Sequence, residues 1–337
     1  MKTNNRLKRP RGVYINKRDL DVLETLWYYQ SLRERTLRRF HFPSIQHRRH
    51  IHRPLYRLVQ TGYLKRRLPP RIHRESNDFF FPERLDTAYY ITPKGADLLC
   101  HEGRIDEANP ERLGQIDRLT SQMLALFHHD LDVRDIRACL DLALQNTKDI
   151  VLLDWCDEND QEDGKRILKT KVSLQYQTGK TKSITHMPDA CFTLQQRKTG
   201  SEKIFFVEVD LGTESGARRW RDKVMAYLAY QKQAFRLHFP EYQENNFAVL
   251  TITRSRGGVN QEMRLDTLIA QTLHTGGRGQ FYFTTFRQIM PDNFVTGDYF
   301  LTKPVWQQAT PGAWVPPKER KKSGRKNLLR TLCEAFG

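Results

Sequence analysis

The sequence predicts an α/β protein (α+β overall) with two domains. The first is helical and ends in two strands, and the second is a mixed sheet flanked by helices. Three observations lead to this prediction. A chain of 337 residues is long for one hydrophobic core and comfortable for two. Apolar residues recur at helical spacing between positions 16 and 62, whereas strand-like and helical patterns alternate after position 188. The positive charge is concentrated near the two ends.

The basic residues are distributed very unevenly. Lysine and arginine number 56 against 39 acids in the whole chain, and residues 1–75 contain 20 of the basic residues but only 5 of the acids. The segment 318–330 adds 7 basic residues and 1 acid, whereas the stretch between is mildly acidic. Because solubility does not require a one-sided distribution, this pattern favours binding of a polyanion at the two ends.

The cysteines and the lengths of the apolar segments indicate in which cellular compartment the protein is expected. The five cysteines are scattered without a CxxC pair or a metal-ligand spacing, so reduced structural thiols are expected. The N-terminus has charges but no apolar stretch behind them, and no apolar run of about 18 residues occurs. We therefore expect a cytoplasmic protein with no membrane partner.

Three helices are predicted in the first domain. The first follows Asn16 as N-cap, the second covers 32–40, and the third is capped by Ser44 and ends at Gly62. Pro54 falls inside the third helix, where it is expected to kink or restart the helix.

Two strands, 63–67 and 87–92, follow these helices and are joined by a long basic loop. Three helices and a two-stranded wing are typical of a winged helix-turn-helix, whose third helix enters the major groove of DNA. An ordinary solvated helical subdomain is the alternative. The candidate contacts with double-stranded DNA, mostly to phosphates, are Arg48, Arg49, Arg53, Arg57, Lys65, Arg66 and Arg67.

The second domain is predicted to run in the order hairpin, helix, strand, helix, strand. Its elements are expected at 188–194, 203–210, 214–235, 247–253, 262–273 and 280–286.

Three carboxylates are expected at one end of the hairpin. Glu208 and Asp210 share a face of their strand, because side chains alternate along a strand, and Asp189 begins the neighbouring strand. Three acids in one place require a proton or a cation, and Mg²⁺ suits oxygen ligands together with a substrate phosphate. The sequence thus offers Asp189, Glu208 and Asp210 as metal ligands for phosphodiester cleavage, and acids that simply face solvent are the alternative. Lys223 on the following helix either extends towards these carboxylates or is a surface lysine.

The Pro188-Asp189 pair, the strand Phe206-Val207-Glu208-Val209-Asp210 and the order of elements resemble the PD-(D/E)XK nuclease superfamily. This resemblance implies a restriction-endonuclease-like mixed sheet flanked by helices, with Asp189 and Glu208 binding the metal. The superfamily lysine belongs two residues after the second acid, where this chain has Asp210. In some members this lysine has moved to the next helix, where Lys223 is its counterpart. The catalytic set that the resemblance implies is Asp189, Glu208, Asp210 and Lys223.

The order of short motifs over residues 13–305 more particularly resembles the replication-relaxation family of plasmid and mobile-element proteins. The motifs are Leu58-Val59-Gln60-Thr61-Gly62, Tyr90-Ile91-Thr92-Pro93-Lys94-Gly95, Pro188-Asp189-Ala190, Glu208-Val209-Asp210, Gly212-Thr213-Glu214 and the helix 223–230.

The family resemblance implies a DNA-binding role in replication, mobilisation or its control, without a well-defined catalytic activity. Double-stranded DNA and a relaxase or replication proteins are the implied partners, and a homodimer is left open. Two alternatives stand beside this role. One is an active Mg-dependent endonuclease targeted by the winged helix, and the other is a transcription regulator whose second domain senses a ligand.

The expected boundaries follow from these assignments. Asp135 is expected on a helix surface, and the alternative is the additional metal-site acid that some nucleases of the superfamily use. Residues 154–160 are expected to form a solvated acidic loop. The domains are a basic arm (1–12), the winged helix (13–105), a helical linker (106–130), the nuclease-like domain (131–305) and a basic flexible tail (306–337).

Overall fold

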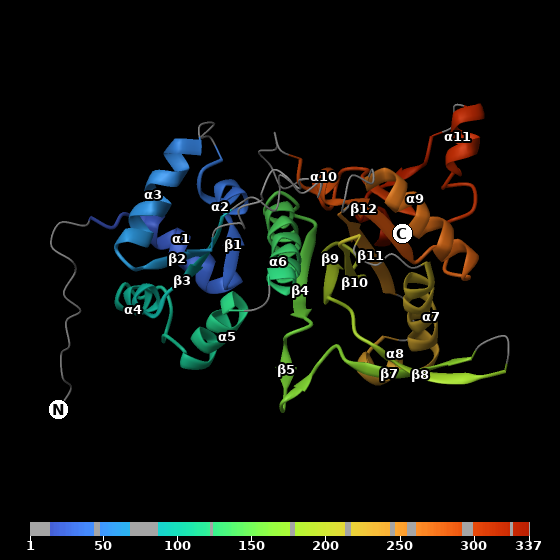
Figure 1. The fold of residues 1–337 in the computed structure, drawn as a ribbon, viewed down its shortest axis with the longest axis horizontal. Helices are drawn as coiled ribbons and strands as arrows, with labels where there is room; N and C mark the ends of the chain where they lie inside the picture. The colour runs from blue at the N-terminus through green and yellow to red at the C-terminus, as the bar shows by residue number, and fades with distance from the viewer. Residues whose placement is uncertain are drawn as a thin grey trace, which may run out of the picture. The chain divides into compact units, whose positions relative to one another are not determined.

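The computed structural model forms two compact units, shown in Figure 1. Unit 1 extends to Ala138, and unit 2 begins at Cys139. The described residues are 14–43, 48–67, 87–121, 124–175, 179–212, 217–242, 247–254, 261–291, 299–323 and 326–336.

Unit 1 contains helices and a small antiparallel sheet in the order β1-β3-β2. The strand β3 lies in the middle, because Tyr90 pairs with Ser31 on one side and with Lys65 on the other. The elements are α1 (Lys17–Tyr29), β1 (Ser31–Arg33), α2 (Glu34–His41), α3 (Arg48–Gln60), β2 (Leu64–Arg67), β3 (Ala88–Ile91), α4 (Pro93–His101), α5 (Pro110–Ser121) and α6 (Leu124–Gln145), the last of which continues into unit 2.

Helix α1 begins where the sequence predicts. The side chain of Asn16 accepts a hydrogen bond from the backbone of Asp19, and the Asp19 carboxylate accepts one in return from the Asn16 backbone. This capping box satisfies two backbone donors that the helix itself cannot pair. Val22, Leu23 and Leu26 point into the core at helical spacing.

Helix α3 runs without interruption through Pro54, so of the predicted kink or restart the restart does not occur. The predicted N-cap of this helix, Ser44, lies outside the described residues. Proline removes one backbone hydrogen bond from a helix and favours a kink. Ile51, Leu55 and Leu58 are fully buried on either side of it. Packing of this apolar face holds the helix together across the missing bond.

The turn from the small sheet into α4 depends on Gly95. A Cβ atom at this position would lie 2.4 Å from the carbonyl oxygen of Tyr63 and 2.7 Å from the side chain of Ile91. Thr92 caps α4, because its hydroxyl accepts a hydrogen bond from the Gly95 backbone at 3.1 Å. Only glycine fits this close approach between α4 and the strands.

A buried ionic cluster links β1 to α6 within unit 1. The guanidinium of Arg33 lies 2.7 Å from the carboxylate of Asp132 and pairs directly with Asp135. Thr36 also donates a hydrogen bond to Asp135 at 2.6 Å. The expectation of a surface aspartate at 135 is therefore wrong, because Arg33 and Thr36 neutralise and satisfy this carboxylate inside the unit.

Unit 2 is built on a seven-stranded mixed sheet in the order β14-β13-β12-β11-β10-β9-β4. Its central strands β10, β11 and β12 are parallel, β9 pairs antiparallel with β10, and β4 pairs antiparallel with β9. The elements are β4 (Ile150–Asp157), β5 (Gln161–Glu162), β6 (Lys165–Arg166), β7 (Thr170–Gln175), β8 (Thr181–His186), β9 (Ala190–Gln196), β10 (Glu202–Asp210), α7 (Ala217–Gln233), α8 (Phe235–His238), β11 (Phe247–Thr253), α9 (Gln261–His274), β12 (Phe281–Thr285), α10 (Phe286–Ile289), β13 (Trp306–Gln308), α11 (Pro317–Ser323) and β14 (Leu329–Arg330).

The predicted order of hairpin, helix, strand, helix and strand is found from β9 to β12. Phe206 on β10 and Phe247 on β11 pack against Tyr227 of α7 in an aromatic core. Trp220 of α7 donates a hydrogen bond to Thr272 of α9 at 2.9 Å, which ties the two helices together. This packing fixes α7 against the face of β10 that carries Glu208.

Two segments of unit 2 differ from the sequence predictions. The acidic stretch expected as a loop begins inside β4, where Asp154 accepts a hydrogen bond from the backbone of Thr193 at 2.7 Å. The expected flexible tail contributes β13 and β14 to the sheet, with Trp306 and Leu332 fully buried. The composition of this segment predicts disorder because its many basic residues outnumber the few apolar side chains that are buried.

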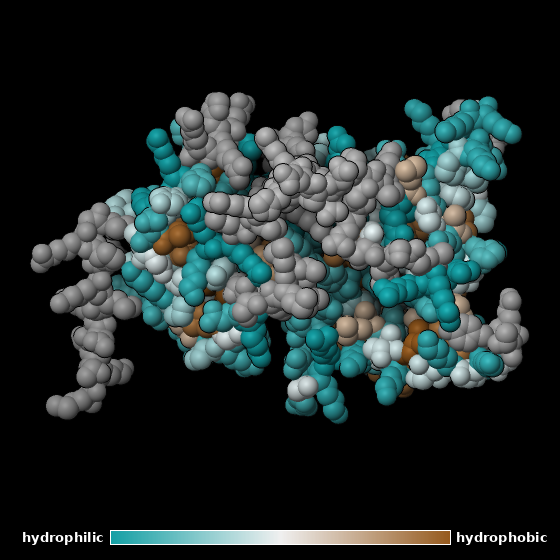
Figure 2. All heavy atoms as spheres, in the orientation of Figure 1, coloured by the Kyte–Doolittle hydropathy of each residue, from teal (hydrophilic) through white to brown (hydrophobic). Residues whose placement is uncertain are grey.

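One face of the molecule is mainly polar (Figure 2). On the face drawn in Figure 2, the coloured residues are mostly hydrophilic, and the hydrophobic ones form small separate areas. None of the described helices is both long and apolar enough to cross a membrane.

Candidate functional site

The predicted DNA-contacting residues of unit 1 divide into two groups. Arg53 on α3 and Lys65 on β2 are exposed. Arg66 lies over the ring of Tyr56, with 5.3 Å between the guanidinium carbon and the ring centroid. Tyr56 is itself 41% exposed and stacks on His52 at 5.7 Å. These side chains form a cationic and aromatic surface on α3 and β2, which is suited to phosphates.

Two of the predicted contacts have partners inside unit 1. Arg57 forms an ion pair with Asp19, the same carboxylate that caps α1. Arg67 lies over the ring of Phe127 at 4.2 Å. Both side chains therefore have a structural role, and the side chains of Arg48 and Arg49 lie outside the described residues.

The second site centres on Glu208 in the middle of the unit 2 sheet. This side chain is buried on the face of β10 that α7 covers, and it forms an ion pair with Lys223. The hydroxyl of Tyr227, one helical turn further along α7, donates a hydrogen bond to its other oxygen at 2.7 Å. The predicted reach of Lys223 towards the carboxylates is thus present. We call Asp189, Glu208, Lys223 and Tyr227 the carboxylate–lysine site.

Burial and charge act in opposite directions on Glu208. Burial raises the pKa of Glu208 to about 7, Lys223 lowers it, and the neighbouring carboxylate of Asp189 raises it. The ion pair and the Tyr227 hydrogen bond both favour the charged form. The result is a carboxyl group that titrates near neutral pH, a property found at many functional sites.

Asp189 precedes β9, as the sequence predicts, and lies close enough to influence Glu208. One of its carboxylate oxygens accepts a hydrogen bond from the backbone of Val209 at 2.6 Å. The Asp189 backbone in turn donates to the carbonyl of Val207 at 3.1 Å. These bonds fix the start of β9 against β10.

Asp210 is turned towards α9. Arg264 donates hydrogen bonds to both of its carboxylate oxygens, at 2.9 and 2.7 Å. Thr253 at the end of β11 adds a third at 2.6 Å. Although Asp210 and Glu208 share a face of β10, their side chains are bound by different helices.

The three predicted metal ligands therefore do not share one arrangement. Both oxygens of Asp210 are taken up by a guanidinium, which does not suit a cation ligand. Glu208 also has a partner at each oxygen, but these are a lysine and a tyrosine hydroxyl rather than a paired guanidinium. One or two carboxylates are what Mg²⁺ requires alongside a substrate phosphate. A metal at this site would therefore be held by Asp189 and Glu208, and not by all three acids.

His186 at the end of β8 is a residue of this region that the sequence did not single out. It is 3% exposed, and its ring packs against Tyr227 at 4.4 Å and against Tyr230 at 4.6 Å. Burial and, secondarily, the positive charge of Lys223 lower the pKa of His186 to about 3. It is neutral at physiological pH and holds Tyr227 in place. One buried histidine on a polar strand gives no recognisable sequence pattern.

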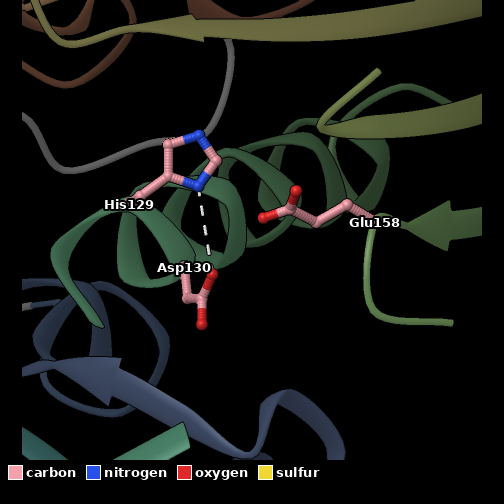
Figure 3. Close-up of side chains that lie close together, drawn as sticks. All are labelled: His129, Asp130 and Glu158. Carbon is pink, nitrogen blue, oxygen red and sulfur yellow. Dashed lines mark ion pairs between the residues drawn. The ribbon is translucent and has the colours of Figure 1, made fainter. Parts of the chain in front are cut away.

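Figure 3 shows His129 and Asp130, which follow each other on α6. The Nδ1 atom of His129 lies 3.9 Å from the Asp130 carboxylate. Glu158, also drawn, belongs to unit 2. Two ligand atoms do not complete a metal site within unit 1, because a closed site takes about four.

The fold defines a mixed α/β protein. Unit 1 carries a basic surface on α3 and β2, and the sheet of unit 2 carries the carboxylate–lysine site. The sequence profile of the replication-relaxation family matches residues 23–240, and the chain belongs to this family. No curated protein and no solved structure matches the chain.

Proposed function

We propose that this chain is a cytoplasmic DNA-binding protein of a plasmid or mobile element, which acts in replication, mobilisation or its control. The observation that carries the proposal is the basic surface formed by exposed Arg53 and Lys65 and half-buried Arg66 on α3 and β2. Membership of the replication-relaxation family supports the same role.

The architecture of unit 1 supports a winged helix-turn-helix. Three helices precede an antiparallel pair of strands, and β1 completes the sheet beside β3. In winged helices the third helix reads the major groove and the wing contacts the backbone. In this chain α3 would enter the groove, with Arg53 towards the DNA and Lys65 and Arg66 on phosphates.

Unit 2 is best explained as a nuclease-like fold that serves recognition or assembly. The order of β9, β10, α7, β11, α9 and β12 agrees with the PD-(D/E)XK resemblance. The position of the motif lysine is occupied by Asp210, which Arg264 binds at both oxygens. A relaxase or replication protein is the partner that this unit would bind, and a homodimer is its proposed oligomeric state.

An active Mg-dependent endonuclease is the second candidate, and one observation favours it. Lys223 on α7 reaches Glu208, which is where a lysine displaced from the motif is needed. Asp189 and Glu208 would hold the metal, which would stabilise charge on the phosphate during phosphodiester cleavage. Lys223 would hold the Glu208 carboxylate in its charged form.

A cleavage assay separates the two candidates. Supercoiled plasmid is incubated with purified protein and Mg²⁺ or Mn²⁺, alongside the variants Asp189→Ala and Glu208→Ala. The binding role predicts DNA binding without nicking in every metal. Metal-dependent nicking that both variants lose would establish the endonuclease instead.

A further inference from the structure

Unit 2 contains a groove of about 830 Å³ between the β7–β8 hairpin, the first turns of α7 and the end of α9. Four basic residues line it, two from the hairpin and two from the helix. We call it the basic groove and define it by Lys180, Lys182, Arg218 and Arg221.

Local geometry places these cations on two facing walls. Lys180 directly precedes β8 and Lys182 is the second residue of this strand, so both lysines belong to the same end of the hairpin, where both line the groove. Arg218 and Arg221 are three positions apart on α7, so they lie on the same face of the helix. The hairpin packs against this helix through buried Val172 and Leu174, which hold the two walls in place.

The charge of the groove is one-sided. All four basic side chains are exposed, and of the described residues that line the groove only Asp222 is acidic. Met225 is the apolar residue on its wall. Exposed cations along an open groove suit an extended polyanion, whereas a small ligand is usually bound in an apolar pocket with a few convergent polar groups.

We propose that the basic groove binds the phosphate backbone of nucleic acid and gives unit 2 a DNA contact of its own. The proposal rests on the proposed function for the identity of the polyanion. It also adds to it, because residues between the basic ends of the chain are mildly acidic and composition gives no sign of a second contact. Helix α7 carries both the groove arginines and Lys223, so nucleic acid in the groove lies along the helix of the carboxylate–lysine site.

The test measures binding of full-length protein to a duplex oligonucleotide at several salt concentrations. The quadruple variant Lys180→Ala, Lys182→Ala, Arg218→Ala and Arg221→Ala removes the groove cations. Each lost phosphate contact is expected to reduce the slope of log affinity against log salt by about one, and affinity should fall at least about tenfold. The control Lys171→Ala with Lys232→Ala removes exposed lysines of β7 and α7 outside the groove and should change neither quantity.

A photo-crosslinking amino acid in place of Thr181, which lines the groove, provides a second readout in otherwise unaltered protein. Crosslinks to the oligonucleotide support the proposal, and their loss when excess inorganic phosphate is added shows that phosphate is the recognised group. An unchanged salt slope in a folded quadruple variant, or crosslinks only to protein, would overturn it.

A variant of the α3 and β2 surface separates failure of the groove proposal from failure of the proposed function. If Arg53→Ala with Arg66→Ala lowers the slope but the groove variant does not, the groove proposal fails and the proposed function stands. If the unaltered protein binds no DNA, the proposed function fails first.

Discussion

The guanidinium of Arg264 holds the carboxylate of Asp210 through two parallel hydrogen bonds of 2.9 and 2.7 Å. This paired geometry is the strongest form of an arginine–carboxylate contact. Asp210 occupies the position where the PD-(D/E)XK resemblance predicts a lysine. The bond joins the end of β10 to α9, so it explains why an acid is stable at this position.

Arg264→Ala should destabilise the protein by about 2 kcal/mol, because it removes the guanidinium from the largely buried carboxylate of Asp210, to which the Thr253 hydroxyl still donates a hydrogen bond. Chemical denaturation followed by circular dichroism measures the change. Arg287→Ala, which removes an exposed arginine of α10, is the control and should have little effect. Equal destabilisation by both variants would show that the Asp210 contact contributes nothing specific.

Arg33→Met should be more severe. It leaves Asp132 and Asp135 buried without their guanidinium, and breaking a buried ionic cluster in this way costs about 3–5 kcal/mol. Arg104→Met is the matched control, because it removes an arginine from partly exposed ion pairs with Asp21 and Glu24 and should cost less than about 1 kcal/mol. The free energies of unfolding of the two variants are compared, and a mild effect of Arg33→Met would contradict the cluster's role.

Lys223→Met should raise the pKa of Glu208 above its value of about 7, because the lysine lowers it. NMR titration of carbon-13-labelled glutamate measures this directly. A folded pKa above the ordinary value means that protonated Glu208 contributes stability below pH 4.5, which is lost as the pH rises through about 7. Lys223→Met should keep the stabilising contribution of protonated Glu208 to higher pH. Lys232→Met, which removes a lysine of the same helix, is the control. A pKa that falls in Lys223→Met would mean that the ion pair is absent in solution.

His41 should make the stability of the protein sensitive to mild acid. Burial lowers the pKa of His41 to about 4 from 6.5, and its ring contacts the hydroxyl of Thr25 at 2.8 Å. Between pH 6.5 and pH 4 the unfolded chain therefore binds a proton at His41 that the folded chain does not bind. The contribution of His41 to stability is complete above pH 6.5 and is lost progressively as the pH falls to 4. Thermal melting should show a fall in Tm over this window that is shallower in His41→Gln. Parallel Tm curves would exclude His41 as the cause.

Parts of this structure could be predicted from local patterns. Asn16 signals the start of α1 because a capping side chain acts over three residues. The alternation around Glu208 predicts its strand and the face it shares with Asp210. Lys223 is found beside Glu208 because a helix following the strand covers that face.

Other parts depend on contacts between distant residues. The β7–β8 hairpin is rich in lysine, serine and threonine, and only alternate residues such as Val172 and Leu174 reveal its buried face. The choice of Asp210 between a metal and Arg264 depends on a residue 54 positions away. The groove depends on lysines and arginines that come together only when α7 packs against the hairpin.

The central claim is that unit 1 binds duplex DNA through the α3 and β2 surface. The most direct measurement is the salt dependence of duplex binding by the double variant Arg53→Ala with Arg66→Ala. The control is the double variant Lys17→Ala with Arg118→Ala, which removes two exposed charges from α1 and α5. The account predicts that the first variant weakens binding and reduces the slope by about two, while the second leaves both unchanged. Identical affinity and slope in the two variants would contradict it.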